Sequence, residues 1–450
     1  MPRRRRSGPS WRALGLALGL STASALMVGP AAGAAQSGVP MSSLRVLAGP
    51  VAAKGRVLVV NVATSGYLQL SAINPATQRV AWQQPYSASD LAAGESFTPT
   101  AIGNIAIDLA PVGSPASGNV RIQGINISTG QVVWTYKEQG TTSDTAAACA
   151  SSGTFCLGWQ SASVQGLIEV NAANGSLLRT IAGPIRALAT NLYETSATTS
   201  TVLQIGSAGQ ELWSKPTASI FGPVNNDPDN GWAADPHGSL NVGSFANANN
   251  ATSTFVTGTT TGFSIATGSP VWTTPGTYNC IGALELQASP VLCRFSGAVV
   301  KSSNPAVMFG GLRASISGFN LKTGKVLWTQ PDQAGLSLLQ VNPLPIADGQ
   351  HIVIRQGGVP RLLDVSSGTT AAVAAGSVLW CSTSPQIKVA GIPSYEGTNT
   401  MTGSNQYFGC TASGRAVTGR PANQPSVVGV RAGGKFFWLT PRGLAAAPAS

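Results

Sequence analysis

Apolar and polar residues alternate in a short pattern that recurs along the whole chain, and residues 319–328 show it most clearly. Phe319 and Leu321 alternate with polar neighbours, as on a half-buried strand. Thr323-Gly324 follows as a tight turn, because glycine adopts the positive φ that such turns require. The residues from Val326 begin a returning strand with branched and aromatic side chains. The pattern therefore predicts a β-hairpin.

Seven further segments repeat this hairpin pattern with substitutions. Including residue 324, the turn positions are residues 78, 130, 175, 209, 268, 324, 368 and 434, and neighbouring turns lie 34 to 66 residues apart. In six copies a tryptophan follows the turn by four residues: Trp82, Trp134, Trp213, Trp272, Trp328 and Trp438. Arg179 and Ala372 occupy that position in the other two copies.

The repeat predicts the fold. A period of roughly 40–50 residues with four short strands per unit is typical of a β-propeller. We predict an all-β propeller of seven or eight four-stranded blades, with eight favoured, over residues 36–450. The repeated tryptophans should fill the space between adjacent blades. Ring closure should pair a strand near the start of this domain with strands at its end. A pair of β-sandwiches is the alternative, but sandwiches do not repeat a Thr-Gly-x-x-x-Trp pattern.

The N-terminal segment reads as a targeting signal. Arg3–Arg6 are followed by an apolar run from Leu14 to Val28, and Ala32-Gly33-Ala34 offers a small-residue cleavage pattern. The run is short for a membrane span. We predict a signal peptide over residues 1–35, with an uncleaved anchor as the alternative, and a secreted or cell-envelope protein without a stable membrane span after cleavage.

Charge does not indicate nucleic-acid binding. The formal net charge is +11, but five arginines lie within the first twelve residues. Without them, 22 Lys and Arg face 16 Asp and Glu, which leaves a net charge of +6. The remaining charges are scattered and form no basic stripe, so we expect no nucleic-acid partner. We expect a monomer.

The six cysteines predict disulfides, because an even count is typical of an exported chain. Fifteen connectivities are formally open. We favour pairing between sequence neighbours, because each bridge then closes a local loop: Cys149–Cys156, Cys280–Cys293 and Cys381–Cys410. A metal site is disfavoured, because no Cys-x-x-Cys spacing occurs and the chain has only two histidines.

The densest group of acidic residues lies between Asn225 and His237. Asp227, Asp229 and Asp235 could place carboxylate oxygens around a calcium ion. The segment lacks the glutamate of an EF-hand loop, and its prolines favour an irregular polar loop stitched by Asx turns. We favour the loop and keep calcium as the alternative.

Catalytic patterns are weak elsewhere. His237 and His351 are the nominal bases for a hydrolytic triad, but no Gly-x-Ser-x-Gly turn presents a serine. His351 heads the apolar strand Ile352–Ile354, where a structural role is favoured.

The copies at 125–134 and 319–328 resemble the repeat of pyrroloquinoline quinone (PQQ)-like β-propellers, which ends in Asp/Asn-x-x-Thr-Gly-x-x-x-Trp. That family includes quinoprotein dehydrogenases and envelope-assembly scaffolds, so the resemblance implies a fold more than an activity. Its dehydrogenases hold the quinone over a disulfide of adjacent cysteines, with calcium and an acidic base, and this chain has no adjacent cysteines. We therefore expect a non-catalytic platform that binds a protein or glycan, without a cofactor. A quinoprotein oxidoreductase using PQQ and calcium is the alternative.

Overall fold

The computed structural model describes residues 38–89, 98–113, 118–142, 146–149, 151–183, 185–189, 191–196, 200–206, 210–222, 232–245, 258–278, 290–296, 313–332, 344–346, 350–390 and 400–449. All of them fall within one compact unit, Ala34–Ser450. The predicted signal peptide, residues 1–35, lies outside the described residues and stays a prediction. Within the described part, no helix is long and apolar enough to cross a membrane.

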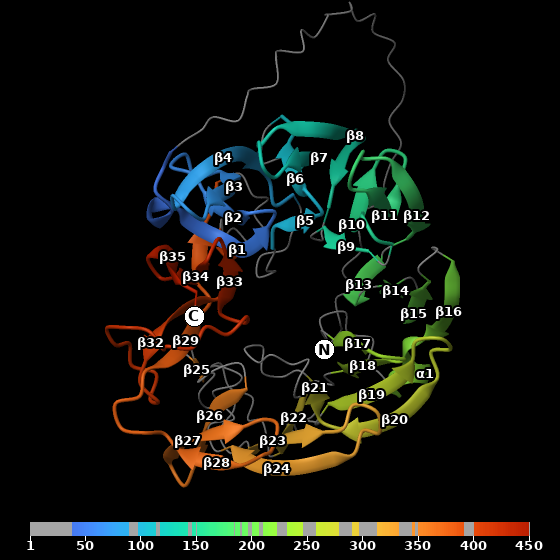
Figure 1. Ribbon diagram of the computed structural model, residues 1–450. Helices are drawn as coiled ribbons and strands as arrows, with labels where there is room; N and C mark the ends of the chain where they lie inside the picture. The colour runs from blue at the N-terminus through green and yellow to red at the C-terminus, as the bar shows by residue number, and fades with distance from the viewer. Residues whose placement is uncertain are drawn as a thin grey trace, which may run out of the picture. The chain divides into compact units, whose positions relative to one another are not determined.

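The described residues form almost only antiparallel strands, which confirms the all-β prediction (Figure 1). Four-stranded meanders follow one another in chain order. The first is β1 (Arg45–Ala53), β2 (Arg56–Val62), β3 (Leu68–Asn74) and β4 (Arg79–Tyr86). The second is β5 (Thr100–Ile102), β6 (Ile105–Pro111), β7 (Val120–Asn126) and β8 (Val132–Thr141). The third is β9 (Ala147–Ala148), β10 (Thr154–Ser161), β11 (Gln165–Asn171) and β12 (Leu177–Ala182), and β8 pairs with β10 to join it to the second.

The next three meanders repeat the same order. The fourth is β13 (Ile185–Ala189), β14 (Leu192–Ser196), β15 (Ser200–Ile205) and β16 (Glu211–Pro216), followed by the short helix α1 (Thr217–Phe221). The fifth is β17 (Trp232–His237), β18 (Leu240–Phe245), β19 (Thr259–Ser264) and β20 (Pro270–Pro275). The sixth is β21 (Thr277–Tyr278), β22 (Val291–Ser296), β23 (Arg313–Phe319) and β24 (Val326–Asp332).

The last strands depart from this order. The seventh meander is β25 (Leu344–Ile346), β26 (His351–Gln356), β27 (Val359–Asp364) and β28 (Thr370–Ala372), and β29 (Leu379–Thr383) and β32 (Gln406–Cys410) extend its sheet. The hairpin β30 (Gln386–Lys388) and β31 (Thr400–Thr402) and the sheet β33 (Gly429–Ala432), β34 (Lys435–Thr440) and β35 (Gly443–Pro448) complete the described chain. No separate eighth four-stranded meander occurs among the described strands, so the blade number stays a prediction.

Most of the predicted turns join the third and fourth strands of their meanders, and the turn at residue 434 joins β33 and β34 instead. An asparagine or aspartate side chain closes five of the described turns, and Ser264 closes the turn at residue 268. Asn126 Oδ1, for example, accepts hydrogen bonds from the backbone N–H groups of Ser128 and Thr129 at 2.9 and 3.2 Å. Gly130 then adopts a φ of 74°. Gln78 occupies the same place in the first copy with a φ of 56°, so the turn geometry persists without glycine.

The turn glycine of one meander meets the tryptophan of the meander before it. Trp82 Nε1 donates to Ile127 O at 2.8 Å, and a Cβ on Gly130 would lie 2.4 Å from Trp82 Cγ. The same pair of contacts recurs three more times, in Trp134 with Ala172 and Gly175, Trp213 with Ile265 and Gly268, and Trp272 with Leu321 and Gly324. The repeat thus encodes the junction between meanders as well as the hairpin.

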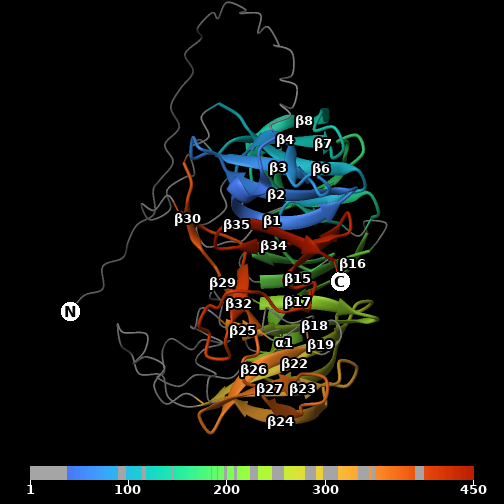
Figure 2. The same ribbon diagram turned by 60° about the vertical axis from the view of Figure 1, so that its left-hand side comes forward.

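The two ends of the described unit meet through side chains rather than through strand pairing. Met41, from the 3-10 helix η1 (Met41–Ser43), is buried together with Val46 and Val59 against Phe437 and Leu439. Figure 2 shows β1 beside β34 and β35. The described part of β1 pairs only with β2, so the predicted pairing between the end strands is wrong there. An apolar cluster supplies the closing contact instead.

The hairpin β30–β31 adds a second contact to the first meander. Ile387 and Met401 are buried in the same apolar cluster as Leu47. Ser404 N donates to Leu47 O at 2.8 Å, and Ala390 N donates to Gly66 O at 2.8 Å. This hairpin comes from the C-terminal part of the chain, and its repeat-free sequence gave no basis for predicting where it docks.

The prediction of an irregular loop through His237 is wrong for residues 232–237, which form β17. Pro236 lies opposite Asn241 of β18. Since β17 is the first strand of its meander, its other edge is not paired among the described strands, and an edge strand tolerates a proline.

We expect Gly130→Ala to destabilise the fold more than Gly103→Ala. Both glycines have positive φ, 74° and 61°, which costs alanine about 1–2 kcal/mol. Nothing lies within 4 Å of a Cβ at residue 103, whereas a Cβ at residue 130 would overlap Trp82. Overpacking adds about 1–3 kcal/mol. Urea unfolding measures both variants, and an equal loss would show that the Trp–Gly contact is unimportant.

Candidate functional site

In five successive meanders, the residue directly before the tryptophan position of the motif has an exposed apolar side chain. We call this set the outer row; it comprises Val133, Leu178, Leu212, Val271 and Leu327. Their exposed fractions lie between 42 % and 61 %. They belong to β8, β12, β16, β20 and β24, each the last strand of its meander (Figure 1). Since side chains alternate along a strand, an inward tryptophan places its predecessor on the outside.

Two of the three predicted disulfides are confirmed. Cys149 bonds to Cys156 and Cys381 bonds to Cys410, with Cα–Cα distances of 5.4 and 5.8 Å. Cys293 is disulfide-bonded as well. Cys280 lies outside the described residues, so its pairing with Cys293 stays a prediction.

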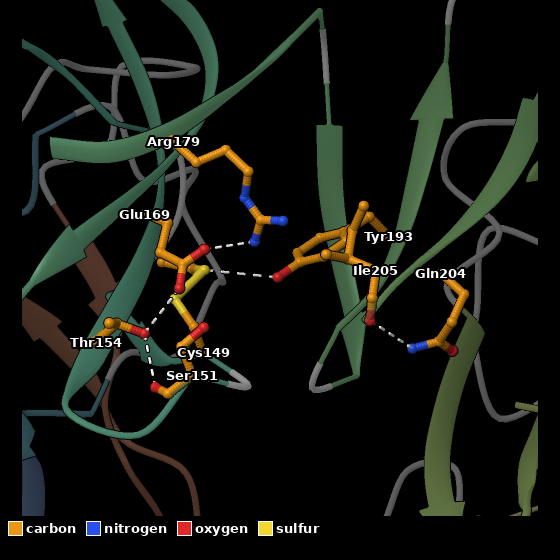
Figure 3. A network of polar contacts seen from close by, with 9 residues as sticks. Cys149, Ser151, Thr154, Glu169, Arg179, Tyr193, Gln204 and Ile205 are labelled. Atoms are coloured by element: carbon orange, nitrogen blue, oxygen red, sulfur yellow. Dashed lines mark hydrogen bonds and ion pairs between the residues drawn. A yellow bond between two sulfur atoms is a disulfide. The ribbon is translucent and has the colours of Figure 1, made fainter. Parts of the chain in front are cut away.

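A polar cluster replaces the tryptophan contact after the third meander (Figure 3). Arg179 occupies the motif position of the tryptophan, and its Nη2 lies 2.5 Å from Glu169 Oε2 on the neighbouring strand β11. The Glu169 side chain is only 5 % exposed. Thr154 Oγ1 donates to the other carboxylate oxygen of Glu169 at 3.0 Å. A buried charge is thereby paired and hydrogen-bonded, as burial requires.

The fourth meander approaches this cluster through Tyr193. The Tyr193 hydroxyl lies 3.5 Å from Cys156 Sγ, and Figure 3 shows the phenol directed at the disulfide. Leu203 and Ile205 pack in the same apolar cluster as the two cysteines. Burial raises the pKa of Tyr193 to about 12, so the phenol is neutral in the physiological pH range. The junction therefore combines a disulfide, a phenol and an internal ion pair.

A second polar cluster joins the fifth and sixth meanders and contains two residues singled out from the sequence. His237 Nε2 lies 2.8 Å from the Tyr278 hydroxyl, and Tyr278 is also hydrogen-bonded to Asp235. Burial is the main cause that lowers the pKa of His237. Burial, followed by the charge of Asp235, raises the pKa of Tyr278. The tyrosine links the aspartate and the histidine within one group.

The structure describes only one of the three aspartates of the predicted calcium loop. Asp227 and Asp229 lie outside the described residues, and Asp235 points from β17 to Tyr278. In the described ranges, no three His, Cys, Asp or Glu side chains are grouped as metal ligands. The calcium site stays a prediction.

Asp108, on β6, is a buried carboxylate that the sequence analysis did not single out. It is 1 % exposed, and neither carboxylate oxygen has a hydrogen-bond partner among the described residues. Burial raises the pKa of Asp108 well above its ordinary value. Burial is the main cause that raises the pKa of Tyr86, and the negative charge of Asp108 is the second cause. An unpaired buried carboxylate favours its protonated form.

With this geometry established, the comparisons with known proteins decide the family. The family model described as outer membrane protein assembly factor BamB matches residues 22–206 and 198–423. The chain belongs to this family. Its fold is a PQQ-like repeat β-propeller, as the Thr-Gly-x-x-x-Trp motif predicted. None of the curated proteins matches the chain.

Solved structures of BamB and of quinoproteins are similar to this BamB-family chain. BamB from Moraxella catarrhalis is 13 % identical, with a TM-score of 0.40, over 74 % of this chain and 92 % of that chain. Quinohemoprotein alcohol dehydrogenase from Comamonas testosteroni is 10 % identical, with a TM-score of 0.43, over 86 % of this chain and 77 % of that chain.

The described residues of this BamB-family chain do not fit the quinone site that the resemblance implies. Cys149 and Cys156 are separated by seven positions and lie under Tyr193 and Leu203. Cys381 and Cys410 are fully buried beneath further apolar side chains. Neither described disulfide joins adjacent cysteines or offers an open face for a planar ring.

We expect the Glu169–Arg179 pair to show strong coupling in a double-mutant cycle. Glu169→Leu or Arg179→Leu alone leaves a buried charge unpaired and should cost about 2–4 kcal/mol, whereas the double variant should lose much less than the sum. Unfolding free energies of the four proteins measure the coupling. Lys137→Ala is the control, because the Lys137–Glu138 pair is surface-exposed and should change stability by less than about 1 kcal/mol. Additive losses at Glu169 and Arg179 would contradict the expectation.

We expect Asp108→Asn to stabilise the protein increasingly as pH rises from 4 to 8. A carboxyl whose folded pKa is raised stabilises the fold at low pH and loses this contribution as pH rises through the folded pKa. Asparagine does not titrate. Asp364→Asn is the control, because hydrogen bonds from Ser366 lower the pKa of Asp364 and its contribution is constant over this range. Unfolding free energies at pH 4, 6 and 8 distinguish the two; parallel curves for Asp108→Asn and the parent would refute the assignment.

Proposed function

We propose that this protein is an exported, non-catalytic β-propeller that binds a partner protein in the cell envelope or outside the cell. The outer row carries the proposal, because the same motif position exposes an apolar side chain on the last strand of five successive meanders. Single exposed apolar residues are common on protein surfaces. Here, however, the repeat places one at the same position of these five meanders, so that they form a regular set. The description of the family, an outer membrane protein assembly factor, supports a protein partner.

The strands that carry the outer row offer a specific mode of recognition. β16, β20 and β24 are end strands of their sheets, so one backbone edge of each has no strand partner among the described residues. Such an edge accepts an extended segment of another protein through main-chain hydrogen bonds. The apolar side chain beside the edge supplies contact area and selects the segment.

An extracytoplasmic location is part of the same proposal. The disulfides support it, because they persist in oxidising compartments. The predicted signal peptide over residues 1–35 agrees with export.

Site-specific photo-crosslinking in the native host tests the platform. A photoreactive phenylalanine analogue at Leu178 or Leu327 should give a discrete adduct with the same protein in both cases. Asn174 and Lys322 are the matched controls, because they are exposed in the turns that precede the same two strands and should give no adduct. Equal labelling at turns and strands, or no adduct at either strand, would refute the proposal.

The alternative, an oxidoreductase using PQQ and calcium, predicts a different result. Incubation with both cofactors should then give dye-linked oxidation of alcohols or sugars, whereas the platform should give none above background. Turnover that depends on added quinone would replace the platform proposal with the enzyme.

A further inference from the structure

A polar cavity lies where the C-terminal part of the chain meets the first meander. Its volume is about 440 Å³, and β1, the segment 402–407 and the start of β33 contribute to its lining. We call it the closure pocket. Its polar side chains include Thr98, Ser384, Thr402, Ser404, Asn405 and Tyr407, and none of its described lining residues is charged. The volume falls within the range of roughly 300–1,000 Å³ that is usual for small-molecule sites.

The closure pocket is held in place by hydrogen bonds behind its surface. Ser384 Oγ donates to Asn405 Oδ1 at 2.6 Å, and Asn405 is also hydrogen-bonded to the buried Tyr407 phenol. These contacts fix the amide of Asn405. Ser404 N donates to Leu47 O, which fixes the segment against β1. A ligand therefore meets an ordered wall and loses little free energy in organising it.

Several polar groups of the pocket remain available to a ligand. The hydroxyls of Thr98 and Ser404 make no hydrogen bond to any described residue, and both side chains are at least partly exposed. Thr402 Oγ1 accepts a hydrogen bond from Gln386 Nε2 at 2.9 Å, which leaves its own hydrogen free to donate. A shift of register between Ala48 and Val51 takes Gly49 and Pro50 out of the regular ladder with β2, and their backbone lines the pocket.

This chemistry matches a neutral sugar. Hydroxyls and an amide both donate and accept hydrogen bonds, as the hydroxyls of a sugar do. An anionic ligand would lack a cation, because no described lining residue is charged. Pro50 and three valines, Val427, Val428 and Val430, also line the pocket, so a short peptide is the competing ligand that the test includes. We propose that the closure pocket binds a neutral oligosaccharide, at a site separate from the outer row.

Calorimetric titration of the purified protein with maltotriose, cellotriose and triacetylchitotriose tests the proposal. At least one of these neutral trisaccharides should bind with a Kd on the order of 1 mM or tighter. Thr98→Val and Ser404→Ala should each weaken binding by about three- to tenfold, because each removes one hydrogen bond. Thr180→Val is the matched control, since Thr180 is an exposed threonine of β12 and should leave affinity unchanged.

The outcomes separate this site from the proposed protein partner. Thermal melting shows whether the variants fold. If Ser404→Ala unfolds at a lower temperature than the parent, the affinity of Thr98→Val decides the test. Absence of binding by all three sugars, unchanged affinity in Thr98→Val, or equal binding of glucuronate or trialanine would overturn the inference. Photo-crosslinking at Leu178 and Leu327 stays informative in each case, because those residues do not line the pocket.

Discussion

The contact between an indole ring and a turn glycine is the constraint on which the described fold depends. Trp82 fits against Gly130 only because that glycine has no Cβ, and the indole N–H then reaches Ile127 O. The glycine therefore meets two requirements, a positive φ within its own turn and space for a ring from the meander before it. At the four junctions that keep both contacts, a large rigid side chain that is buried or half-buried fixes the spacing between meanders.

One departure from this contact, at residue 179, coincides with a buried polar cluster. Arg179 stands where the tryptophan should be, and an ion pair with Glu169, a disulfide and Tyr193 fill the junction. Trp328, by contrast, still lies against Gly368, and Gln330 donates to Gly368 O at 2.8 Å just as Gln84 donates to Gly130 O at 2.7 Å at the first junction. At the Arg179 junction, side-chain hydrogen bonds and the ion pair therefore take the place of the tryptophan contact.

The sequence predicts the fold far better than the site, and the reason lies in the range of the interactions. Gly130 and Trp134 belong to one hairpin, so their spacing is visible in the chain. Sequence-neighbour cysteines such as Cys149 and Cys156 are equally local, and their pairing was predictable. Tyr278 lies 41 positions from His237 and carries no motif, so nothing in the sequence joined them. Asp108 was missed because its strand is otherwise apolar, although a lone acid in such a strand was a usable signal.

The same reasoning explains why the closure region escaped prediction. A repeat specifies each junction between equivalent units, but the junction between the first and last units joins segments that are not equivalent. Here Met41 and Val46 pack against Phe437, and the hairpin β30–β31 covers Leu47. Neither the segment 41–46 nor the hairpin β30–β31 follows the motif, so their sequences are free to carry other properties. The cavity at this junction is lined by several hydroxyl groups and by no tryptophan, so it differs from the junctions that the repeat specifies.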